Sequence, residues 1–113
     1  MAAVYVNNLV INAGSDFSQS FTLEGSDTNS AFDLTSYTVV AQMRKWSGSS
    51  SATTFTSSIL QASEGKILLT LTSTQTSALK PGRYVYDVVI IDEFETKNRV
   101  IEGMVLVREG VTR

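Results

Sequence analysis

The stretch that decides the fold is LTSTQTSALKPGRYVYDVVIID, residues 71–92. It runs from alternating apolar residues through a small polar patch to Pro81, the only proline of the chain, and then into a second alternating run. Proline lacks an N–H donor and fixes φ, so it marks the entrance to a strand and not its centre. Pro81 and Gly82 therefore predict a tight corner, with Tyr84 at the start of a long strand.

The residues around this corner predict how it is held. In Greek-key sandwiches, a tyrosine at the start of strand F donates its hydroxyl to backbone a few residues upstream and so pins the E–F crossover. We expect Tyr84 to do this, Leu79 to be the apolar plug beneath the crossover, and residues 73–79 to form a short helical turn. LKPGRY resembles the fibronectin type III corner, but its leucine-to-tyrosine spacing is five residues, shorter than the usual form. We therefore expect an immunoglobulin-like relative and not a true fibronectin domain.

The rest of the chain alternates apolar and polar residues with period two, which is the pattern of half-buried strands. Polar turn segments separate these runs, and the Ser/Gly-rich residues 47–54 read as a loop tip. We predict an all-β, immunoglobulin-like Greek-key sandwich of about seven strands, with a short helical turn in the E–F crossover, as one domain over residues 1–113. The predicted strands span residues 9–14, 16–24, 37–46, 54–60, 66–72, 83–92 and 98–109.

Composition excludes several classes of function. The chain has no cysteine and no histidine, which removes thiolate zinc sites, disulfides and histidine-based catalysis. Nine basic and eleven acidic residues give a net charge of −2, with no basic stripe for nucleic acid. No apolar run approaches the roughly 20 residues that span a bilayer, and the N-terminus lacks the pattern of a signal peptide. We expect a chain synthesised in the cytoplasm, with no nucleic-acid or membrane partner.

The motifs of catalysis and cofactor binding do not occur either. The glycines form no phosphate-binding GxGxxG or GxxxxGK loop. Asp92, Glu93 and Glu95 cluster in one turn, but their spacing matches no calcium loop, and Lys97 and Arg99 follow directly. This turn is expected to be a solvated hairpin connection between the last two strands. We expect no enzyme, and no catalytic, cofactor or metal residues.

The last two predicted strands are apolar on both faces, whereas a strand with one solvated face should alternate. Their outer face is therefore expected to be covered, as an interface with other copies or other proteins. Arg44, Asp87 and Glu102 would form a small charged cluster within it. If these strands pair with residues 37–46, the candidate interface comprises Val40, Gln42, Arg44, Val85, Asp87, Val89, Ile91, Val100, Glu102, Met104 and Leu106.

Two alternatives remain open for this face. The segments QASEG (61–65) or GSDTNSAFD (25–33) could fold over it, or the inner and outer assignments could differ between strands. A second class of function is also open. Trp46, beside Arg44 and Lys45, could stack on a sugar ring, which would make the domain a carbohydrate-binding or adhesin-like module.

Four segments together resemble a recurrent immunoglobulin-like domain of tailed-phage virion proteins. They are DFS (16–18), DLTSYTVVAQMR (33–44), LTLTSTQTSALKPGRYVYDV (69–88) and RVIEGMVLV (99–107). These segments resemble the N-terminal domain of phage baseplate upper proteins, and the similarity spans residues 9–107. The resemblance implies a non-enzymatic structural protein of the virion, in the tail or baseplate, that docks on other virion proteins and forms homo-oligomers. Because the chain ends soon after Val107, we expect a small standalone component and not an adaptor.

Overall fold

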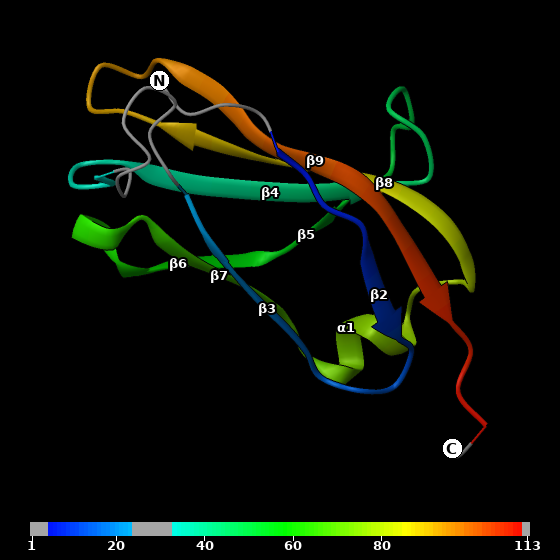
Figure 1. Ribbon diagram of the computed structural model, residues 1–113. Coiled ribbons are helices and arrows are strands. Elements are labelled where there is room, and N and C mark those ends of the chain that lie inside the picture. Colours follow the sequence, from blue (N-terminus) through cyan, green and yellow to red (C-terminus); the bar gives the residue numbers. More distant parts are fainter. Residues whose placement is uncertain (1–4, 24–32, 112–113) are drawn as a thin grey trace.

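The computed structural model describes residues 5–23 and 33–111 of the 113-residue chain. Two β-sheets pack face to face, with one short helix at one end (Figure 1). The larger sheet contains β1 (Tyr5–Val6), β2 (Leu9–Asn12), β4 (Thr38–Arg44), β5 (Thr53–Thr54), β8 (Gly82–Ile91) and β9 (Lys97–Arg108). The smaller sheet contains β3 (Phe17–Thr22), β6 (Thr56–Gln61) and β7 (Lys66–Leu71). The helical segments are α1 (Ser73–Ser77) and the 3₁₀ turn η1 (Ala62–Glu64).

The strand order identifies the topology. The larger sheet has the order β1-β9-β8-β4-β5, with β2 also on β9, and the smaller sheet has the order β3-β7-β6. Strands β1 and β2 run parallel to β9, and all other pairs are antiparallel. This is an immunoglobulin-like β-sandwich, as the sequence predicted. The seven predicted strands and the helical turn are present with boundaries within two residues, and β1 and β5 are short additions.

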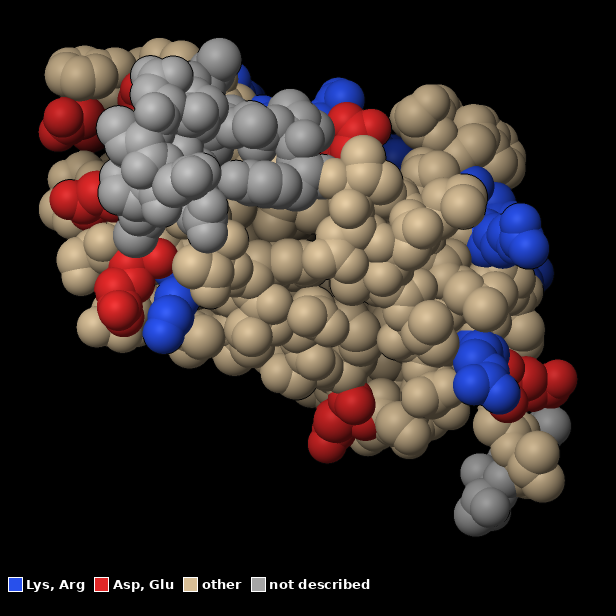
Figure 2. Space-filling view, in the orientation of Figure 1, with Lys and Arg blue, Asp and Glu red and all other residues tan. Residues whose placement is uncertain are grey.

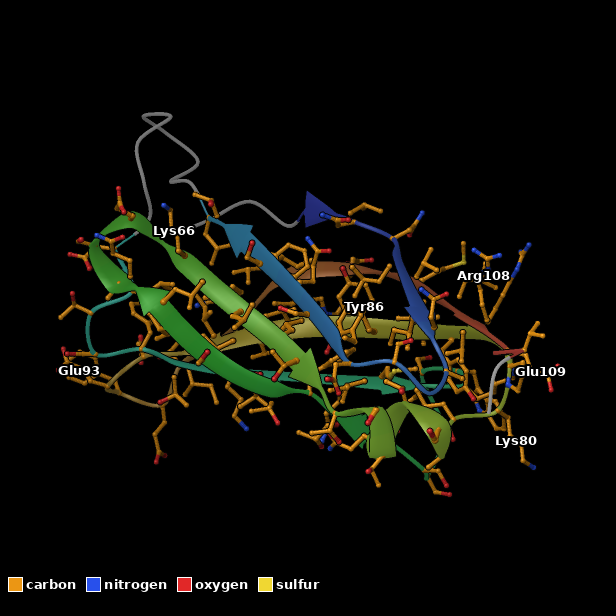
Figure 3. All side chains as sticks on the ribbon, turned by 90° about the horizontal axis from the view of Figure 1, so that it is seen from below. Lys66, Lys80, Tyr86, Glu93, Arg108 and Glu109 are labelled. Atoms are coloured by element: carbon orange, nitrogen blue, oxygen red, sulfur yellow. The ribbon has the colours of Figure 1, made fainter. Side chains whose placement is uncertain are left out.

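The core lies between the sheets and is made by the inward half of each alternating strand. Leu69 on β7 and Val88 on β8 are completely buried, and Phe55 packs between Phe17 and Tyr86, with ring centroids 6.0 and 6.3 Å away. Figure 3 shows Tyr86 between the two layers. The buried faces of β3, β4, β7 and β8 are those that the alternation predicts.

The corner at Pro81 is confirmed in its parts. The Tyr84 hydroxyl donates to the Lys80 carbonyl at 2.7 Å, and Leu79 packs partly buried against the core. Gly82 has a φ of 138°, a value that favours glycine. The Lys45 ammonium lies 4.9 Å from the centroid of the Tyr84 ring and covers the corner from the end of β4.

Replacing Tyr84 by phenylalanine is expected to lower the free energy of unfolding by about 1 kcal/mol, because the ring and its contact with Lys45 stay while the hydroxyl bond is lost. Urea denaturation followed by circular dichroism measures this. A midpoint equal to that of the wild type would show that the corner does not depend on the bond.

Helix α1 closes the end of the sandwich below the corner. Thr72 and Gln75 form a capping box at its start. Thr76, which is fully buried, accepts a hydrogen bond from the Gly14 N–H at 3.0 Å and donates to the Ser15 carbonyl at 2.9 Å. The E–F crossover is thereby fixed to the turn between β2 and β3.

The N-terminal strands are fixed to β9 at a kink. Between β1 and β2 the Asn7 N–H donates to the Glu102 carbonyl at 2.9 Å, and the Asn8 side chain accepts from the Met104 N–H at 3.0 Å. The Tyr86 hydroxyl donates to the Asn7 carbonyl, and burial raises the pKa of Tyr86 to about 12. The kink lies over Gly103, where a side chain would meet the Asn7 backbone.

Candidate interface on the outer face of the larger sheet

The outer face of the larger sheet is the side of β2, β9, β8 and β4 that points away from the smaller sheet. Its large apolar side chains are exposed: Val40 by 37%, Met104 by 48% and Leu106 by 42%. Val85, Val89 and Ile91 on β8 are half-buried beside them. Strands β8 and β9, which were predicted to be apolar on both faces, therefore do present apolar residues on both sides of the sheet.

Val10 also belongs to this face, and it was not among the predicted residues. It lies opposite Leu106 in the parallel pair of β2 and β9, and it is 51% exposed. The strand at residues 9–14 was expected, but alternation within a strand does not tell which neighbour it pairs with. Val10 could be assigned to the face only once β2 was placed on β9.

The register divides the face into two apolar groups separated by a polar row. Asp87 lies opposite Glu102 on β9 and Gln42 on β4. On one side of this row, Val85 lies between Met104 and Arg44, and on the other side Val89 pairs with Val40. An interface core with a few polar positions has this composition.

Val100 was predicted to lie on the outer face, and this is wrong. A β-bulge shifts the register so that Val88 pairs with Ile101 and Val89 with Arg99, which leaves Val100 as the extra residue. Both Val100 and Ile101 point inward, with exposures of 0% and 1%. The inner and outer assignments therefore change within β9, whereas the alternative left open from the sequence was only that they could differ between strands.

The charged cluster was also predicted with the wrong cation. The described residues pair Asp87 and Glu102 with Arg99, at 3.3 and 3.7 Å. The Arg44 guanidinium instead donates to the Ser49 carbonyl and to the Gln42 side chain. Strict alternation would put Arg99 on the inner face with Ile101, and the bulge moves it outward. All three charged side chains of the pairs are at least 40% exposed, so these pairs add little to stability.

A shallow depression of about 750 Å³ lies in the polar part of the face. Arg44, Asp87, Glu102 and Met104 line it, and Trp46 lies at its margin with 62% of its surface exposed. The predicted sugar-stacking residue is thus placed beside hydrogen-bonding groups of both charges.

The segment QASEG does not cover this face. Residues 61–65 form the η1 turn between β6 and β7, where the Ala62 carbonyl accepts from Leu34 and the Gly65 carbonyl accepts from Leu23. Their partners belong to the end of the sandwich core. The other candidate cover, residues 25–33, lies outside the described residues apart from Asp33.

The outer face of the smaller sheet is different in kind. Its exposed positions are mostly small hydroxyl side chains, with Leu60 the large apolar exception at 54% exposure. The exposed hydroxyl side chains on β3 and β6 are Ser18, Ser20, Thr22, Thr56 and Ser58. The two outer faces of one sandwich therefore offer a built-in comparison between an apolar and a polar surface.

The acidic turn after β8 has a structural role. The Asp92 carboxylate accepts from the backbone N–H groups of Phe94 and Thr96, both at 2.9 Å, and so closes the hairpin between β8 and β9. Among residues 5–23 and 33–111, no group of three or more acidic side chains is arranged to hold a metal ion. In the same ranges no helix is long and apolar enough to cross a membrane.

No protein-family model matches the sequence, and no curated protein sequence matches it. Similar solved structures include an internalin-like protein of Listeria monocytogenes, with 14% identity and a TM-score of 0.45, where the match covers 95% of this chain and 28% of that chain. They also include AggA, the major subunit of aggregative adherence fimbriae type I of Escherichia coli, with 12% identity, a TM-score of 0.44 and 89% of both chains covered. At these scores neither likeness bears on the function of this chain.

Proposed function

We propose that the chain is a non-enzymatic structural protein of a phage virion, of the tail or baseplate, which acts by docking on protein and on itself through the outer face of the larger sheet. The observation that carries this proposal is the exposure of Val10, Met104 and Leu106 on one side of the polar row and of Val40 on the other side, all on the same face of the larger sheet. Exposed groups of large apolar side chains bordered by polar residues commonly mark sites of protein–protein interaction. The resemblance of four sequence segments to virion domains supports the virion setting.

The face also has the features that make docking specific. Asp87, Arg99 and Glu102 form a charged row across β8 and β9 between the two apolar groups. In a docked complex such a row disfavours registers that leave a charge against an apolar surface. Burial of the apolar groups would supply the affinity, and the charged row would select the register.

Val89→Lys and Met104→Lys are each expected to weaken self-association more than about 100-fold, because a strongly hydrated ammonium group would replace an apolar side chain in the contact. Both side chains point away from the core, so the variants should fold. Multi-angle light scattering at matched concentrations should show a lower mass for each variant than for the wild type.

Leu60→Lys is the matched control, since it also replaces an exposed apolar residue by lysine but lies on the smaller sheet. It should keep the mass of the wild type. If Leu60→Lys and Met104→Lys behave alike, the outer face of the larger sheet is not the contact.

Trp46 supports a second candidate function, a carbohydrate-binding or adhesin-like module. Its indole is 62% exposed at the margin of the depression that Arg44 and Asp87 line, which combines a stacking surface with hydrogen-bonding groups. A glycan array probed with the wild type and with Trp46→Ala tests this. Binding by the wild type that is lost in the variant would favour the module, and no binding by either protein would remove it.

A further inference from the structure

Strand β3 is an open edge of the smaller sheet. Within the described residues it pairs only with β7, and Figures 1 and 3 show it on the far side of β7 from β6. Its six residues pair with β7 in one continuous register without a bulge. The side of the molecule that carries β2 and β3 shows few charged residues near its middle (Figure 2).

The other sheet edges have features that hinder pairing with another chain. The register of β6 shifts between Ile59 and Gln61, and the Asn7–Asn8 kink separates β1 from β2. In the described part of the chain, β4 is paired on its outer side only at Gln42 and Met43, by the two-residue β5. Natural edges are commonly protected by such bulges, short strands and interruptions, or by charged residues and proline. The β3 sequence FSQSFT contains no charged residue, no proline and no glycine.

The alternation of backbone hydrogen bonds along β3 shows which of its N–H and carbonyl groups point toward the open edge. The Leu23 N–H donates to the Gly65 carbonyl at 2.8 Å, so residues 17, 19 and 21 exchange backbone bonds with β7. The N–H and carbonyl groups of Ser18, Ser20 and Thr22 therefore point toward the edge. The Gln19 side-chain amide donates to the Ser20 carbonyl at 3.0 Å, at an exposed position.

The sequence of this edge is symmetric about Gln19, since residues 17–21 read FSQSF in both directions. We propose that β3 pairs with β3 of a second copy, antiparallel, about a two-fold axis that passes Gln19. Ser18 then lies opposite Ser20 of the other copy, and Phe17 opposite its Phe21. The backbone N–H and carbonyl groups of Ser18 and Ser20 face the open edge, so in this register they would bond to each other across the contact. The side chains also match, because serine lies opposite serine and phenylalanine opposite phenylalanine.

The pairing explains both faces of the strand. Phe17 is only half-buried in the single chain, and the ring of Phe21 from the other copy would cover it on the inner side. On the outer side, Ser18 and Ser20 would join the hydroxyl-rich surfaces of the two smaller sheets. A two-fold contact uses the edge of both copies at once, so it closes and does not propagate along the sheet. This contact is independent of the outer face of the larger sheet.

Cross-linking tests the register, because the chain has no cysteine of its own. Gln19→Cys places one thiol from each copy at a non-hydrogen-bonded pair, where Cα atoms are roughly 4.5 Å apart and a disulfide can form. Mild oxidation should convert most of this variant into a dimer on a non-reducing gel. In Ser18→Cys the two thiols lie on opposite sides of the axis, with Cα atoms roughly 8 Å apart, beyond disulfide reach. Ser58→Cys, exposed on β6, gives the background level.

A pair of charge variants tests the contact without cysteine. Ser18→Lys/Ser20→Glu places opposite charges across the two-fold, and Ser18→Lys/Ser20→Lys places like charges there. Both are made together with Val89→Lys, which removes the contact through the larger sheet. We expect the double-lysine variant to dissociate at about tenfold higher concentration in sedimentation equilibrium than the Lys/Glu variant.

Two results would overturn the proposal: Gln19→Cys dimers no more abundant than those of Ser58→Cys, or equal dissociation of the two charge variants. The outcomes also separate this contact from the outer face. Cross-linking of Gln19→Cys that persists with Val89→Lys supports the β3 pairing whatever the larger sheet does. Loss of self-association in Val89→Lys with background cross-linking of Gln19→Cys supports the outer face alone and contradicts the β3 pairing.

Discussion

Gly103→Ala is expected to lower the free energy of unfolding by about 3 kcal/mol. An added Cβ would overlap the Asn7 carbonyl oxygen and lie 2.9 Å from its carbon, and both are backbone atoms. They cannot retreat easily, because Asn7 is held by its bond to Glu102 and by the Tyr86 hydroxyl. Urea denaturation followed by tryptophan fluorescence measures the loss.

Gly48→Ala is the control for the general effect of replacing glycine. An added Cβ there would lie 3.6 Å from the Trp46 ring, an ordinary contact in an exposed loop, so little change is expected. Equal stability of the two variants would show that the kink over Gly103 moves away from β9 at no cost. The N-terminal strands would then not be a fixed part of the outer face.

Thr76→Val is expected to cost about 2–3 kcal/mol, because the valine keeps the shape but cannot bond to the backbone around it. The Gly14 N–H and the Ser15 carbonyl would lose the part-buried hydrogen bonds that they make with the fully buried Thr76 side chain. Thr74→Val, on the exposed side of the same helix, should change stability by less than about 0.5 kcal/mol. Thermal unfolding by calorimetry compares the three proteins, and a Thr76→Val variant as stable as Thr74→Val would contradict the role of this side chain.

Local patterns explain why much of the fold could be predicted. Alternation with period two reports which half of a strand is buried, and the predicted inner residues of β4 and β7 are the buried ones. The Pro81 corner could be predicted in detail because Leu79, Lys80, Gly82 and Tyr84 are close in sequence. Nothing about it required knowledge of a distant segment.

Features that depend on distant segments were missed or misplaced. The bulge at Val100 lies in the pairing of β9 with β8, and it reversed the faces of Val100 and Arg99 relative to strict alternation. In the sequence, the bulge could have been recognised from the break in apolar–polar alternation at Arg99, Val100 and Ile101. Thr76 and Gly103 gave no signal of their own, because their roles come from contacts with Gly14 and Asn7.

The two sheets divide the surface into regions of different chemistry. The larger sheet presents an apolar face with a charged row, and the smaller sheet presents a hydroxyl-rich face with β3 at its open edge. Two separate self-contacts, one by face and one by edge, would allow a 113-residue domain to build an assembly larger than a dimer. That capacity would suit the structural role proposed above.

The central claim is that the chain associates with itself, and the solution mass of the wild-type protein tests it most directly. Sedimentation equilibrium over a wide range of concentrations should show an average mass that rises from 12.3 kDa to a multiple of it. A single species of 12.3 kDa at the highest concentration reached would contradict the account.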